Sequence, residues 1–170
     1  MKRRFAIPAA VALAALVATA VALAAGGSLG QAQKATVGYK NVDKAIAAGY
    51  SFKLPDKAGN TCIAQQPQGG MGVHMVNKKL LDGTIDASKP EAMVYAPAAG
   101  GKMDLVAIEY VIFKSAWKGS GAPSLFGRQF ALTPAGNRFG LPAYYSLHAW
   151  LYKKNPSGLL APWNPQVSCK

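Results

Sequence analysis

The sequence predicts an α+β fold: one small domain with a mainly antiparallel β-sheet, one short N-terminal helix and a long coiled C-terminal tail. Three observations predict it. Strand-like segments dominate the chain, two of them form a hairpin pattern, and one short segment has helical periodicity with a cap at each end. The tail carries Pro156, Pro162 and Pro165, whose spacing excludes a helix.

Residues 1–33 are predicted to be a signal peptide and linker, and residues 34–170 a single secreted domain. Three basic residues follow Met1, and an apolar run extends from Phe5 to Ala25, which is the order of a secretory signal. Ala22-Leu23-Ala24 offers a small-x-small cleavage site. Because the run approaches the roughly 20 residues that span a bilayer, an uncleaved anchor is the alternative. Both place the domain outside the cytoplasm.

The helix is predicted over residues 42–48. Asn41 is suited to cap its first turn and Gly49 to end it. The apolar residues of this segment fall on one face, which predicts an amphipathic helix packed on a larger element. The preceding residues 31–39 are predicted to form a linker or a short edge strand.

Strands are predicted at residues 61–64 and 71–77. The second alternates between two faces, one with Met71, Val73 and Met75 and the other with Gly72, His74 and Val76. The clearest hairpin joins residues 92–96 to residues 103–113. Both faces of strand 103–113 are largely apolar, which predicts a central strand covered on each side.

Residues 114–142 are predicted to be a long loop that contacts the core at 125–126 and 130–132. Long loops without regular structure are often functional. Residues 144–152 form the last predicted strand, and the tail from residue 155 onward is predicted to lie against the domain.

Cys62 and Cys169 are the only cysteines, and both fall in the predicted secreted domain. In an oxidising compartment they most simply pair with each other. This predicted disulfide would tie the C-terminal tail to the beginning of the domain. Neither cysteine belongs to a close Cys-x-x-Cys pair, which argues against a cysteine metal site.

The chain is basic, with 19 Lys and Arg residues against 7 Asp and Glu residues. Without Lys2, Arg3 and Arg4, 16 basic residues remain, so the predicted secreted domain is itself cationic. Anionic envelope surfaces are therefore candidate partners, and a solubilising lysine surface is the alternative. The lysines are scattered rather than clustered, so no nucleic-acid partner is expected. A membrane contact is expected only through the N-terminal segment, if it is not cleaved.

The sharpest candidate site combines the two histidines of the chain with one carboxylate. His74 and His148 lie in predicted strands, and Glu109 interrupts the most apolar one, on the face predicted to carry Leu105 and Val111. A carboxylate is costly to bury unless it meets a cation, hydrogen-bond donors or a metal. Two histidines and one carboxylate suit Zn²⁺ or another divalent transition metal. The alternative is a structural hydrogen bond between Glu109 and a donor inside the core.

A small-ligand pocket is a further interpretation of the same region. Aromatic walls with a few polar anchors are typical of such pockets. The candidate wall residues are Tyr110, Tyr144, Trp150 and Trp163.

Other catalytic signatures are absent from the sequence. It contains no Gly-x-Ser-x-Gly elbow, no phosphate-binding glycine loop and no His-Glu-x-x-His motif. A glycosidase carboxylate pair would have to include Glu109, and its sequence context does not favour one.

Three segments carry a resemblance: residues 70–77 (GMGVHMVN), residues 106–110 (VAIEY), and residues 147–151 (LHAWL) running into NPSG and WNPQVSC. They resemble a group of uncharacterised exported bacterial proteins, over most of the chain from about Thr36. The resemblance implies export and a single domain, and it transfers no activity.

Together these features predict an exported protein that binds a small ligand or a metal ion without catalysis. The alternatives are a metal-dependent enzyme that uses His74, Glu109 and His148, and a cationic protein that interacts with the envelope.

Overall fold

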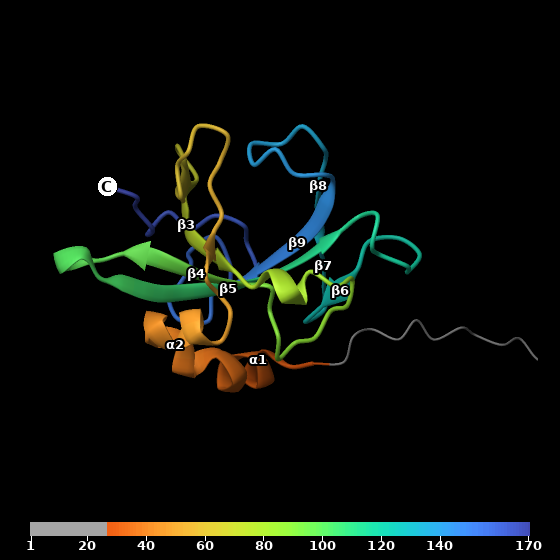
Figure 1. Cartoon of the computed structure of the whole chain (residues 1–170), viewed down its shortest axis with the longest axis horizontal. Coiled ribbons are helices and arrows are strands. Elements are labelled where there is room, and N and C mark those ends of the chain that lie inside the picture. Colours follow the sequence, from red (N-terminus) through yellow and green to blue (C-terminus); the bar gives the residue numbers. More distant parts are fainter. Residues whose placement is uncertain (1–26) are drawn as a thin grey trace, which may run out of the picture.

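The computed structural model describes residues 27–170 and has the predicted α+β fold. Its centre is a seven-stranded sheet in the order β1-β3-β4-β5-β9-β8, with β2 also paired to β3 (Figure 1). Every strand pair is antiparallel. The strands are β1 (Phe52–Lys53), β2 (Cys62–Gln65), β3 (Gly69–Val76), β4 (Ala92–Pro97), β5 (Met103–Phe113), β8 (Ala131–Thr133) and β9 (Tyr144–Ala149).

Two short α-helices precede the sheet and lie together against one of its faces (Figure 1). Helix α2 (Val42–Ala47) confirms the predicted helix, and the Asn41 side chain caps it by accepting hydrogen bonds from two backbone amides. Helix α1 (Leu29–Thr36) and a 3₁₀ turn (Val37–Lys40) replace the predicted linker or edge strand. Helix α1 also crosses the boundary predicted between residues 33 and 34.

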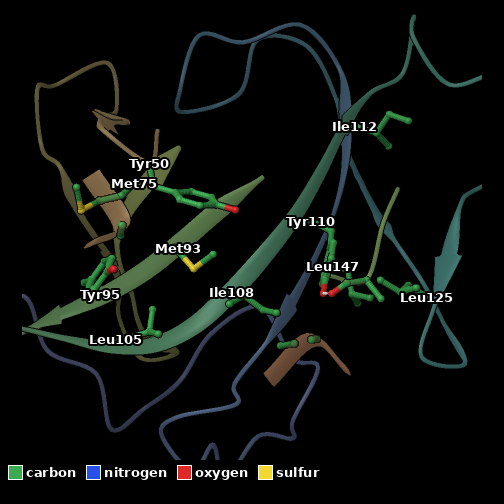
Figure 2. Packing of buried hydrophobic residues seen from close by; sticks show 14 of the residues in the cluster. Tyr50, Met75, Met93, Tyr95, Leu105, Ile108, Tyr110, Ile112, Leu125 and Leu147 are labelled. Atoms are coloured by element: carbon green, nitrogen blue, oxygen red, sulfur yellow. Dashed lines mark hydrogen bonds between the residues drawn. The ribbon is translucent and has the colours of Figure 1, made fainter. Parts of the chain in front are cut away.

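The main core fills the space between the helices and this face of the sheet. Figure 2 shows Ile108, Tyr110 and Leu147 pointing into it from neighbouring strands. The buried tyrosines also satisfy their hydroxyl groups, since Tyr95 donates to the Tyr39 carbonyl and Tyr110 to the Ala87 carbonyl. Each large apolar side chain buried here contributes about 1.5–3 kcal/mol.

Two β-bulges change which side chains share a face. Opposite β4, the register of β5 passes from Ala107 to Leu105, so Val106 is an extra residue. Leu105 therefore packs in the main core, on the face opposite Glu109, which corrects the predicted pattern. A second shift, opposite β2, leaves Met71 unpaired and turns it toward the side of His74.

The segment 114–142 is more regular than the predicted loop. It contains a small hairpin of β6 (Ser124–Leu125) and β7 (Arg128–Gln129), followed by β8 at the edge of the main sheet. Leu125 and Phe130 are buried, which confirms two of the predicted core contacts. The remaining loop, residues 134–142, rises over the opposite face of the sheet.

The chain after β9 crosses that opposite face without a further helix or strand in the described residues. Asn164 exchanges two backbone hydrogen bonds with Gly70 of β3. Glycine is required at this contact, because a Cβ at Gly70 would lie 2.8 Å from the Val167 side chain. Cys169 then reaches Cys62 and forms the predicted disulfide across 107 residues of sequence.

The disulfide indicates an oxidising environment outside the cytoplasm. Within residues 27–170, no helix is both long enough and apolar enough to cross a membrane. The predicted signal peptide or anchor lies almost wholly in residues 1–26, outside the described residues.

Candidate metal centre

Three strands bring His74, Glu109 and His148 together on the face opposite the helices. His148 of β9 is the direct cross-strand partner of Glu109 of β5. His74 of β3 pairs with Val94 of β4, and Ala92, two residues away on β4, pairs with Glu109. Side chains of paired residues share a face, so His74 and Glu109 lean toward each other across β4.

The three side chains are close enough to bind one ion. The two histidine Nε2 atoms are 3.2 Å apart, and Nε2 of His74 lies 3.4 Å from Oε2 of Glu109. The second oxygen of Glu109, Oε1, lies 3.5 Å from Nδ1 of His148. One oxygen of the Glu109 carboxylate thus faces Nε2 of His74, while the other lies near Nδ1 of His148.

These distances fit tetrahedral zinc ligands. Zinc lies about 2.0–2.2 Å from histidine nitrogen and carboxylate oxygen, so two ligand atoms of a tetrahedral site are about 3.3 Å apart. Two of the three ligand–ligand distances, 3.2 and 3.4 Å, match this edge, and all three ligand atoms lie within 4.8 Å of one another. The 3.2 Å distance also fits a hydrogen bond between the two imidazoles.

Burial controls the protonation of the cluster. Each histidine is 2 % exposed, and this desolvation lowers the pKa of both His74 and His148 to about 4. Glu109 is 7 % exposed, and burial raises the pKa of its carboxyl group, an effect that the nearby His74 and a hydrogen bond with Ser146 oppose. At neutral pH both imidazoles are therefore uncharged, which is the form that binds metals.

The cluster also contains an unsatisfied polar atom. Nδ1 of His74 is buried and has no hydrogen-bond partner among the described residues. Leaving such a donor or acceptor unpaired costs about 1–3 kcal/mol. On the other side, the indole of Trp150 stacks on the His148 ring, with the ring planes 16° apart. Packing therefore fixes one imidazole, and the other retains unused hydrogen-bonding capacity.

A cavity of about 680 Å³ opens above His74 and Glu109. Its walls are mainly apolar and come from segments far apart in the sequence. The apolar wall residues include Phe52, Leu54, Met71, Val111, Phe113, Phe139, Leu141 and Trp163. Within the described residues, the group that could hold a metal contains three ligands, so a fourth coordination position is open to a water or to a molecule in this cavity.

The four aromatic residues predicted to line a pocket have different positions. Tyr144 and Trp163 do line the cavity. Trp150 is buried behind His148 and donates its indole N–H to the Ala161 carbonyl. Tyr110 lies on the opposite face of the sheet, in the main core, so its predicted ligand role is wrong. As the neighbour of Glu109 in a strand, it has to point the other way.

Two loops meet over the cavity and form a clasp, by which we mean the contacts between residues 56–57 and residues 136–138. Arg138 forms a 3.2 Å ion pair with Asp56, and the Lys57 amide donates to the Arg138 carbonyl. Hydrogen bonds from Asn60 are the main reason that the pKa of Asp56 is lowered, which keeps it ionised at neutral pH. The clasp joins loops that follow opposite edges of the sheet, β1 and β8.

Sequence reasoning did not identify several cavity residues, namely Phe52, Lys78, Arg138, Phe139 and Leu141. The long segment 114–142, which contains three of them, was the available signal, since loops of this length often carry function. Phe52 and Lys78 lie in short elements without a recognisable pattern.

The chain matches no protein-family model, no curated protein and no solved structure. The candidate function therefore rests on the geometry of the site.

Proposed function

We propose that this protein binds a divalent transition metal ion such as Zn²⁺ through Nε2 of His74, Nε2 of His148 and one oxygen of Glu109. The observation that carries the proposal is the pair of 3.2 and 3.4 Å distances between ligand atoms, which match the edges of a tetrahedral site. The metal would stabilise the carboxylate that burial otherwise disfavours. It would also explain why three polar side chains share one buried position on an apolar sheet.

An ion held by three protein ligands would have a fourth coordination position for another molecule, so its role would not be only structural. Structural zinc sites usually have four protein ligands, whereas sites that bind or transform a molecule keep one position free. The cavity that His74 and Glu109 line has the size of small-molecule sites, so a molecule in it would be able to reach an ion held by these residues. Reversible binding of a small ligand at the ion is the function that this arrangement supports best.

A metal-dependent enzyme is the second candidate, and the same open position favours it. A water molecule bound there would be acidified by the ion and could attack a substrate in the cavity. An enzyme would convert a molecule that binds in the cavity, and this conversion would be lost in Glu109→Gln. Simple binding would leave the bound molecule chemically unchanged in the wild type as well.

We further propose that the protein is exported. The basic and apolar pattern of the N-terminal segment, the resemblance to exported bacterial proteins and the disulfide support this proposal. Mass spectrometry of the protein recovered from culture medium or periplasm should show cleavage near Ala24 or Ala25. Recovery of the protein only from the cytoplasm, with two free thiols, would contradict export.

The metal proposal is tested by elemental analysis of protein purified without a chelator. We expect close to one equivalent of metal in the wild type and clearly less in Glu109→Gln, which lacks the carboxylate ligand. Glu91→Gln is a matched control, because Glu91 is equally buried but lies outside the cluster. Zinc at one hundred times its dissociation constant should stabilise the wild type and the control by about 2.7 kcal/mol. Metal-free protein whose stability zinc leaves unchanged would overturn the proposal.

A further inference from the structure

The walls of the cavity expose apolar surface that nothing in the described chain covers. Val111, Phe113 and Leu141 are only half-buried, although each lines a concave space. Cavities of 300–1,000 Å³ with apolar walls and a few polar groups are typical of small-molecule sites. The cavity therefore suits a ligand with a substantial apolar body.

The charges of the cavity are distributed unevenly. Glu109 is the acidic residue among those that line it, and it is buried at the floor. Lys78 and Arg138 are the basic lining residues. Arg138 is paired with Asp56 in the clasp, but Lys78 has no carboxylate within ion-pair distance among the described residues.

Lys78 lies at the mouth of the cavity. It lies two residues after the end of β3, and its side chain is exposed. Its ammonium lies 3.6 Å from the centre of the Phe52 ring, which is itself part of the wall. An anion next to this ammonium would retain contact with water. An apolar chain attached to that anion would extend along the aromatic wall toward the floor.

We propose that the cavity binds a hydrophobic monocarboxylate, with the apolar body inside the cavity and the carboxylate at Lys78. A cationic ligand would be repelled at this mouth, and an entirely neutral one would gain no attraction from the Lys78 ammonium. This binding does not require the metal ion, so it goes beyond the function proposed above.

The test uses a homologous series of straight-chain acids, hexanoate, octanoate and decanoate, titrated by calorimetry below their micelle concentrations. Burial of each added methylene should raise the affinity about fourfold. Ala131 is an exposed wall residue, so Ala131→Phe narrows the cavity with little risk to folding and should weaken decanoate binding. Affinity that does not depend on chain length, or that Ala131→Phe leaves unchanged, would overturn the proposal.

The position of the carboxylate is tested by charge reversal. Lys78→Glu should weaken decanoate binding about five- to tenfold and leave decanol binding unchanged. Lys79→Glu is the matched control, because Lys79 is the exposed neighbour that does not line the cavity. An equal loss in both variants would indicate a general effect of protein charge and refute the role of Lys78.

The same titrations with and without zinc separate this proposal from the metal proposal. We expect decanoate to bind metal-free wild-type protein as well as it binds the zinc form. If the protein takes up no zinc but binds decanoate, only the metal proposal fails. If decanoate binds only in the presence of zinc, its carboxylate lies at the floor and the placement at Lys78 is wrong.

Discussion

Zinc binding above pH 5 should release protons from Glu109 rather than from the two histidines. The pKa values of His74 and His148 are held at about 4, so both imidazoles are already neutral in this range. Burial raises the pKa of Glu109, so its carboxyl group holds a proton to higher pH than an exposed glutamate does. An exposed site of the same composition would behave in the opposite way, with protons lost from histidine.

The size of the effect follows from the number of protons. While Glu109 is protonated, release of one proton strengthens zinc binding about tenfold for each unit of pH, or about 1.4 kcal/mol. Release of protons from two histidines would strengthen zinc binding by up to about a hundredfold for each unit of pH. In Glu109→Gln the dependence should disappear over this range, and zinc should bind more weakly because an amide oxygen is a poorer ligand than a carboxylate.

Calorimetric titration of zinc in buffers with different ionisation enthalpies measures the released protons directly. At pH 5.5 the wild type should release more protons than Glu109→Gln, because only the wild type has this carboxyl proton to lose. Release of two protons by the wild type, or continued release by Glu109→Gln, would show that the histidines are the protonated groups and would refute the reasoning from burial.

Three further predictions concern the scaffold. Burial raises the pKa of Glu91 to about 8, so the protonated carboxyl group stabilises the folded state fully below pH 4.5, and this stability is lost as the pH rises toward 8. Gln cannot lose a proton. Between pH 4 and pH 7 the free energy of unfolding of Glu91→Gln, measured with urea, should therefore rise by about 3 kcal/mol relative to that of the wild type. An unchanged difference between the two pH values would contradict this. Replacing Cys62 and Cys169 by Ala should lower the free energy of unfolding by at most about 4–5 kcal/mol, compared with wild type measured without reductant. An unchanged free energy would mean that the disulfide does not constrain the unfolded chain. Gly69→Ala should cost about 1–3 kcal/mol in thermal unfolding, because φ is +96° and a Cβ would overlap the Asn164 carbonyl; full stability would show that the tail can move away.

The sequence allowed good prediction of elements with regular patterns. The central strand was predicted at residues 103–113, and β5 occupies Met103–Phe113. Helix α2 was predicted from Asn41 and Gly49, because capping residues act locally and can be recognised without the fold. Helix α1 was missed because it buries only Ala32 and Thr36, too few residues for a recognisable apolar face.

The two bulges were not predictable, since an extra residue in a strand leaves no clear local mark. Val106 is apolar like its neighbours, and only its partner strand shows that it is unpaired. Leu105 and Met71 were therefore assigned to the wrong faces. Bulges change the side-chain alternation for every residue beyond them.

The convergence of His74, Glu109 and His148 was predicted from the strand faces, but their distances depend on strand order. Antiparallel pairing places β5 directly beside β9, whereas β4 separates it from β3. Such pairing is a tertiary property that residue spacing does not contain. By contrast, the error at Tyr110 was avoidable, because adjacent residues in a strand face opposite sides.

The clasp between Asp56 and Arg138 has a consequence for the evolution and engineering of this protein. Hydrogen-bonded strands fix the spacing of the two imidazoles and the carboxyl group, while the clasp joins two surface loops outside the sheet, one of which lines the cavity through Asn137 and Arg138. Insertions or substitutions in those loops can thus alter which molecules enter without moving any atom that would hold the ion. Under the proposed function, the residues that would hold the ion and the residues of the clasp belong to separate parts of the chain, so either group can change while the other is preserved.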